Sequence, residues 1–182
     1  PGTGGLYIGP RASLAPWREG GTGVFSELPL QPEEFPYAFE AGSPNVLGLA
    51  GLRESVRFIL QYGVNWVRTH ELSMAARLLQ ALREDDRFTV YGPSRLEERI
   101  AVVSITVEGT APEHVAAWLN ERHRIAVRAG LHCAPGAHRL IGTFPDGTVR
   151  ISPGYFTTEA DIEWCLEALQ DAAAEAPQAV VG

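Results

Sequence analysis

Apolar residues recur at three- and four-residue spacing in several stretches of the chain, and this period predicts amphipathic helices. The first stretch follows Ser43-Pro44-Asn45 and ends where Tyr62-Gly63 interrupts it. Its predicted apolar face consists of Leu49, Leu52, Val56, Ile59 and Leu60. A second helix is predicted over about 65–84. A third is predicted over about 159–174, with a buried face made of Ile162, Cys165, Leu166 and Leu169.

β-Branched and aromatic runs predict strands between these helices. The runs are Phe88–Tyr91, Ile100–Val107, Ile125–Val127 and Thr148–Ser152, with a further short strand expected at Leu6–Ile8 after the glycine-rich start. Thr110-Ala-Pro-Glu113 carries an N-cap candidate, a first-turn proline and an acid, so a helix should follow over 114–123. This second half of the chain therefore predicts an α+β domain.

The stretch from Gly9 to Asn45 shows no regular period, because prolines interrupt every run of it. A loop of this length inside a domain is usually functional or packs against a partner. The change from this loop to the helices that follow it marks the candidate domain boundary.

The composition excludes several classes of function. The chain has 182 residues, a net charge of -7 and 15 basic residues, all of which are arginine. Without lysine, the chain has no side-chain primary amine for a Schiff base. The acidic balance, with a pI near 5.2, argues against a general nucleic-acid binder. No apolar run reaches the length of a membrane span and no targeting pattern opens the chain, so a cytoplasmic protein is expected.

The two cysteines, Cys133 and Cys165, differ in their surroundings. Cys165 falls on the apolar face of a predicted helix, whereas Cys133 follows a glycine turn beside His132, with Arg128 nearby. Nearby cations favour the thiolate, so Cys133 is a candidate nucleophile, with a buried structural cysteine as the alternative. A metal site formed by His132, Cys133 and His138 is also conceivable, but three ligands without a second cysteine pair are a weak zinc signal, and no metal is expected.

Five segments carry a family resemblance. They are Gly2-Thr-Gly-Gly-Leu-Tyr-Ile8, Phe39-Glu-Ala-Gly-Ser-Pro-Asn45, Arg128-Ala-Gly-Leu-His-Cys-Ala-Pro135, Gly147-Thr-Val-Arg-Ile-Ser152 and the Tyr155–Ile162 helix start. In this order they resemble the C-terminal part of class V aminotransferase-fold enzymes. The Arg-x-Gly-x-His-Cys loop is similar to that of group II cysteine desulfurases and selenocysteine lyase-like enzymes. The resemblance covers nearly the whole chain.

The resemblance implies a pyridoxal 5'-phosphate enzyme that takes sulfur from L-cysteine, leaving alanine and a persulfide on Cys133. It implies that Arg150 pairs with the substrate carboxylate, with Arg128 and His132 in supporting substrate-binding roles. Ser43, beside Gly42, stands where the family usually has threonine, whose hydroxyl reaches the cofactor phosphate of the neighbouring subunit. Alternatives remain: Arg150 could form a surface ion pair, and Ser43 could be a plain turn residue.

The implied fold is α/β with an α+β small domain. It is the C-terminal part of a pyridoxal-phosphate-dependent transferase fold, with long linking helices and a small domain of a mostly antiparallel sheet covered by helices. Residues 1–52 would form the edge of the large cofactor domain, and 53–182 the linking helices and small domain. The family's cofactor lysine would lie just before Pro1, so we expect these residues alone to bind no cofactor covalently and to be inactive.

The resemblance also implies a homodimer and a sulfur-acceptor protein, with iron–sulfur cluster biogenesis as the destination of the sulfur. Two other functions stay open at this point. One is another class V aminotransferase or lyase reaction that uses no nucleophilic cysteine. The other is a non-catalytic interaction or dimerisation module, which the absence of lysine would permit.

Overall fold

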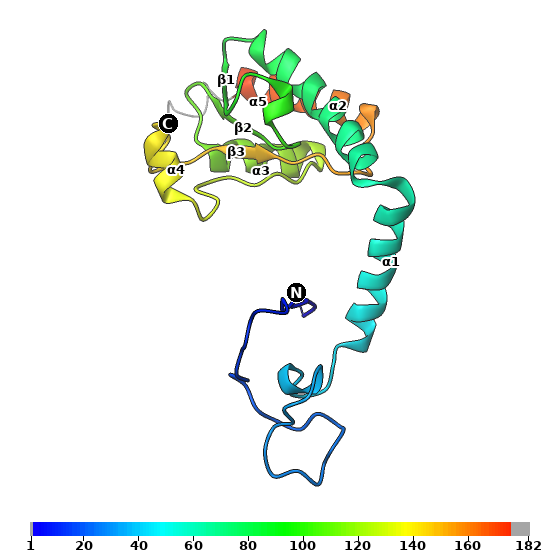
Figure 1. Ribbon diagram of the computed structural model, residues 1–182. Coiled ribbons are helices and arrows are strands. Elements are labelled where there is room, and N and C mark those ends of the chain that lie inside the picture. The colour runs from blue at the N-terminus through cyan, green and yellow to red at the C-terminus, as the bar shows by residue number, and fades with distance from the viewer. Residues whose placement is uncertain (1, 176–182) are drawn as a thin grey trace. The chain divides into compact units, whose positions relative to one another are not determined.

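The computed structural model describes residues 2–175, and the chain divides into two compact units, residues 1–62 and 63–182 (Figure 1). In the first unit, residues 2–45 contain one 3-10 helix, η1 (Tyr37–Phe39), and otherwise irregular backbone. The irregular stretch agrees with the prolines that break its pattern. The strand expected at Leu6–Ile8 is wrong, since this segment pairs with no strand among the described residues.

Helix α1 (Val46–Tyr62) completes the first unit. It begins after Asn45, whose side-chain oxygen accepts a hydrogen bond from the Gly48 N–H at 3.0 Å. It ends before Gly63, whose φ of 85° is a left-handed conformation. The helix is confirmed, but none of its side chains is buried. The apolar positions that predicted it are all at least 42% exposed.

The second unit contains four helices and three strands among its described residues. They are α2 (Val64–Arg83), β1 (Phe88–Tyr91), β2 (Val103–Val107), α3 (Pro112–His123), α4 (Pro135–Leu140), β3 (Val149–Ile151) and α5 (Glu159–Glu175), with the short 3-10 helix η2 (Leu96–Glu98) between β1 and β2. The strands form an antiparallel sheet in the order β1-β2-β3, with Phe88 opposite Val107 and Val103 opposite Ile151. The predicted α+β domain is confirmed.

The core of this unit is formed by the sheet and the helices α2, α3 and α5. Helices α2 and α3 contact the strands, and α5 contacts α2 and α3. β2 alternates buried and half-buried positions, as a strand with one covered face should. Fully buried side chains come from every one of these elements, including Leu78, Ile105, Leu119, Val149 and Leu169. Cys165 is buried as predicted, and burial raises the pKa of its thiol to about 11.

Local signals at the helix ends agree with the sequence. Pro112 lies in the first turn of α3, and Arg124, in a left-handed conformation, ends that helix. At the start of α5, the Asp161 N–H donates to the Thr158 hydroxyl oxygen at 3.2 Å, and the Thr158 N–H donates to the Asp161 carboxylate at 2.8 Å. This reciprocal cap satisfies backbone groups that the helix itself leaves unpaired.

One further expectation is wrong and another stays untested. Ile125–Val127 is not a strand, because the ladder beside β3 begins only at the single bridge between Arg128 and Arg150. The expected domain boundary at residue 52 lies within α1 and stays a prediction. No helix among residues 2–175 is both long and apolar enough to cross a membrane.

Candidate active site

The backbone around Cys133 is fastened to the segment that leads into β3. Arg128 and Arg150 exchange backbone hydrogen bonds of 3.2 and 2.7 Å, and Gly130 and Thr148 exchange a second pair of 3.1 and 3.2 Å. Directly opposed residues of an antiparallel pair project from the same face. The Arg128 and Arg150 side chains therefore leave the same face of this short ladder.

The cysteine itself lies on a tight turn. The Ala134 N–H donates to the Leu131 carbonyl at 2.8 Å, and the turn between them places His132 at φ 50° and Cys133 at φ 60°. Two consecutive residues with side chains in the left-handed region are uncommon. The Cys133 thiol is exposed, and its Sγ lies 3.8 Å from Nη2 of Arg128. The guanidinium of Arg128 and the exposed sulfur of Cys133 are therefore in direct contact.

His132 points away from solvent, into the unit. Its Nε2 lies 3.1 Å from the Thr148 carbonyl oxygen and 3.2 Å from the Thr148 hydroxyl. The pKa of His132 is lowered, first by burial and then by the nearby positive charge of Arg150. The ring is therefore neutral at neutral pH. Its neighbour His138, buried in α4, has its ring centre 5.7 Å away and contacts the Thr143 hydroxyl at 2.7 Å.

Arg150 has an unused donor. Its Nε is buried and has no hydrogen-bond partner among the described residues. A buried N–H without an acceptor costs on the order of 1–3 kcal/mol, so such groups in functional sites commonly meet a ligand. A planar guanidinium is well suited to a carboxylate, which can accept two of its hydrogens.

The other predicted site residues, Gly42 and Ser43, lie in the first unit. The Gly42 N–H donates to the Gly21 carbonyl at 2.7 Å, so the Gly20–Gly23 loop and the Ser43 segment are neighbours. Gly42 has φ 94° and Ser43 is exposed, which leaves the serine hydroxyl open to a ligand.

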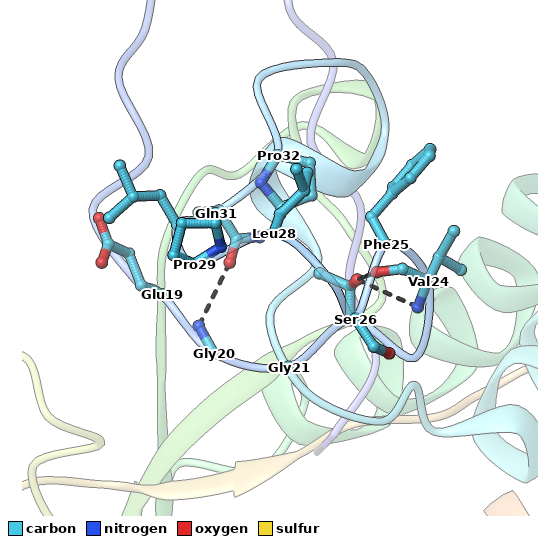
Figure 2. A pocket seen from close by; sticks show the side chains of 12 residues that line it. Glu19, Gly20, Gly21, Val24, Phe25, Ser26, Leu28, Pro29, Gln31 and Pro32 are labelled. Atoms are coloured by element: carbon cyan, nitrogen blue, oxygen red, sulfur yellow. Dashed lines mark hydrogen bonds between the residues drawn. The ribbon is translucent and has the colours of Figure 1, made fainter.

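A cavity of about 490 Å³ lies within the same unit and is lined by residues between Glu19 and Pro32. Figure 2 shows the Gln31 side chain reaching across to Gly20, whose N–H donates to it at 3.2 Å. The other end of the Gln31 amide donates to the Tyr37 carbonyl at 2.6 Å, which ties η1 to this loop. Ser43 is not among the lining residues.

Comparison with known proteins assigns the chain to a family. Residues 1–164 match the profile of the family described as aminotransferase class-V. The chain belongs to the aminotransferase class-V family. Within this class V family, a probable cysteine desulfurase of Methanothermobacter thermautotrophicus is 32% identical over 177 residues. The match covers 94% of this chain and 44% of that protein. A probable cysteine desulfurase of Xylella fastidiosa is 34% identical over 134 residues, which is 74% of this chain and 31% of its own.

Solved class V structures agree. A cysteine desulfurase from Thermococcus onnurineus aligns with a TM-score of 0.70 at 34% identity, over 76% of this chain and 34% of its own. One from Escherichia coli aligns with a TM-score of 0.74 at 25% identity, over 88% of this chain and 39% of its own. These neighbours confirm the predicted fold. The chain spans between about a third and under half of the length of these relatives.

The structure brings Cys133, Arg128, His132 and Arg150 together in the second unit, and Gly42 and Ser43 belong to the first unit. Sequence reasoning missed Thr148, which contacts His132 through two oxygens and is fully buried. A threonine at the start of a strand is common, so only the pairing of 128–130 with 148–150 would have revealed it. No group of three or more His, Cys, Asp or Glu side chains suited to a metal occurs among residues 2–175.

Proposed function

We propose that these residues are the C-terminal part of a pyridoxal-phosphate-dependent cysteine desulfurase, with 1–52 at the edge of its cofactor domain and 53–182 forming linking helices and small domain. One observation carries the proposal. An exposed cysteine lies 3.8 Å from one arginine, and the arginine paired to that one along the backbone holds a buried unused donor. A nucleophile and a carboxylate site are thus adjacent, as an amino-acid thiol substrate requires.

In this proposal the guanidinium of Arg150 binds the substrate carboxylate and orients the amino acid. Pyridoxal phosphate, when bound, supplies the electron sink that weakens the substrate C–S bond. The Cys133 thiolate attacks the substrate sulfur, so that an S–S bond forms and the C–S bond breaks. The electron pair of the broken bond stays on the substrate carbon, which takes a proton to give alanine. Cys133 is left as the persulfide.

Arg128 and His132 have distinct parts in this scheme. The guanidinium of Arg128, next to Sγ, stabilises the negative charge of the attacking thiolate and of the persulfide. His132 is neutral because its pKa is lowered, so it adds no charge to the site. Its ring is held by Thr148, away from the exposed face on which a substrate would bind.

The residues of this chain fit only part of a pyridoxal phosphate site. The exposed Ser43 hydroxyl, beside the open left-handed turn at Gly42, suits a phosphate oxygen, and we propose that it serves the neighbouring subunit of a homodimer. The covalent link cannot come from these 182 residues, because they contain no lysine. We therefore expect these residues alone to release no alanine from L-cysteine.

The remaining parts of the proposal rest on the family resemblance and the class of reaction. A persulfide must be passed on, so we propose a protein acceptor for the sulfur. Following the family resemblance, we also propose that the sulfur supplies iron–sulfur cluster assembly and that the protein is cytoplasmic. L-Cysteine is the proposed substrate, and L-selenocysteine is the competitor that a turnover assay would compare directly.

The test uses the whole protein that carries this chain, loaded with pyridoxal phosphate and supplied with L-cysteine and a reductant. We expect alanine and sulfide in equal amounts. Cys133→Ala should abolish sulfide release and leave the cofactor absorbance unchanged, while the matched control Cys165→Ala should keep turnover. If Cys133→Ala retains turnover, Cys133 is not the nucleophile. If no alanine forms from L-cysteine, another class V reaction is the better description.

A further inference from the structure

Thr148 is a fully buried polar residue that the scheme above leaves without a role. It immediately precedes β3, and its backbone exchanges two hydrogen bonds with Gly130, three residues before Cys133. Its side-chain hydroxyl and its carbonyl both face Nε2 of His132, the residue next to Cys133. Thr148 therefore contacts the cysteine turn twice, through the Gly130 backbone and through the His132 ring.

The turn needs such an attachment. His132 and Cys133 both have positive φ values, and each such residue with a side chain costs roughly 1 kcal/mol relative to ordinary backbone. A strained turn persists only when its surroundings hold it. The turn's own hydrogen bond, from the Ala134 N–H to the Leu131 carbonyl, spans His132 and Cys133 without contacting their side chains.

The ring of His132 supplies the attachment. Its Nδ1 is buried without a partner among the described residues, so Nε2 carries the hydrogen bonding of this side chain. With the ring neutral, an Nε2–H tautomer donates to an oxygen of Thr148 and leaves only a lone pair at Nδ1. The position of the ring then fixes the backbone from which the next residue, Cys133, projects.

We propose that Thr148 is a positioning residue for the Cys133 thiol: by holding the His132 ring, it keeps the left-handed turn in the conformation that sets the sulfur beside Arg128. This rests on the proposed function for its biological meaning, because a nucleophilic thiol must be positioned to reach the substrate sulfur. The geometry itself can be measured on the thiol without any turnover.

The experiment compares two disulfide reagents on the 182-residue chain. Ellman's reagent is a dianion and 4,4'-dithiodipyridine is neutral, so the ratio of their rate constants at Cys133 reports the nearby positive charge of Arg128. Thr148→Val removes the hydroxyl contact with His132 at constant shape and keeps the carbonyl contact. It should lower this ratio about threefold, at the low end of the value of one hydrogen bond. Thr148→Ser should restore it.

Three controls separate positioning from a general loss of structure. Thr106→Val removes a hydroxyl of the same sheet that contacts Tyr91 at 3.1 Å, and it should leave the ratio unchanged. Cys165 should stay protected in every variant. In a His132→Leu background, Thr148→Val should have no additional effect, since Thr148 acts through His132.

An unchanged ratio in Thr148→Val would overturn the proposal. So would an additive effect in the double variant, or a parallel rise in Cys165 labelling, which would mean that Thr148 only stabilises the fold. These outcomes are independent of the desulfurase assay. A protein that releases no alanine could still show the Thr148 effect, and an active one could lack it.

Discussion

Gly147 allows the cysteine turn and the strand β3 segment to approach each other. It has φ 84°, and a Cβ built on it would overlap the carbonyl carbon and oxygen of Gly130. The backbone pairs that hold the active-site turn, 128–150 and 130–148, begin one residue away. Gly147→Ala therefore perturbs the site through crowding and backbone strain, without removing any polar group.

The chain offers a matched control for the size of this effect. Gly142 has a nearly equal φ of 77°, but nothing lies within 4 Å of a Cβ built there. Both substitutions force alanine into the left-handed region, at a cost of about 1 kcal/mol. Only Gly147→Ala adds the overlap with the Gly130 backbone, and relieving such crowding costs about 1–3 kcal/mol more. We expect a destabilisation of about 1 kcal/mol for Gly142→Ala and about 2–4 kcal/mol for Gly147→Ala.

Labelling of Cys165 across a urea series measures the free energy of unfolding of the second unit alone, since that thiol becomes reactive when its core opens. Labelling of Cys133 in the absence of urea reports the turn. Gly147→Ala should shift both signals and Gly142→Ala only the first, by the smaller amount. Equal destabilisation by the two substitutions would refute the argument from close approach.

Three further predictions concern the second unit. In the native chain at pH 8, iodoacetamide should label Cys133 and spare Cys165, whose pKa is raised to about 11 by burial, and mass spectrometry of the peptides would show this. Leu169→Ala, at a fully buried position, should cost about 2–5 kcal/mol in urea unfolding, whereas Leu140→Ala, 87% exposed, should stay within about 0.5 kcal/mol of wild type. Hydrogen bonds from Thr158, first from its hydroxyl and then from its N–H, lower the pKa of Asp161. The stability that the Asp161 carboxylate contributes is therefore present above the unfolded-state pKa of about 3.9 and is lost as pH falls through the lower folded-state pKa. The destabilisation caused by Asp161→Asn, measured by thermal unfolding, should therefore become smaller in acid.

Much of the second unit follows from local sequence. The bounds of β1 and α5 were predictable because their signals are local: Phe88–Tyr91 is a short aromatic and β-branched run, and Thr158 lies where an N-cap should. Ile125–Val127 shows the limit. Its residues favour a strand, but a strand needs a partner, and the neighbouring ladder pairs only from Arg128 onward. Pairing is a long-range property that composition does not contain.

The candidate site divides in the same way. The motif predicted that Arg128 lies near Cys133, and the two side chains are 3.8 Å apart. That the thiol is a nucleophile stays a prediction. The orientation of His132 was not predictable. The sequence predicted a supporting substrate-binding role for His132, which stays a prediction. In the fold its ring contacts Thr148, sixteen positions away in the chain. The contacts of the His132 ring depend on which segment pairs with residues 128–130, and that pairing is a long-range property of the fold.

The low burial of helix α1 and of the irregular segment before it affects the heat-capacity increment of unfolding. Among residues 2–62 only Pro32 and Ala38 are buried, so heating this part of the chain exposes little new apolar surface to water. The heat-capacity increment of unfolding scales with that surface. It should therefore match the second unit alone, about 1.5 kcal/mol/K, and not the roughly 2.5 kcal/mol/K typical of 182 residues packed throughout. A larger value would show that α1 acquires a covered face in solution.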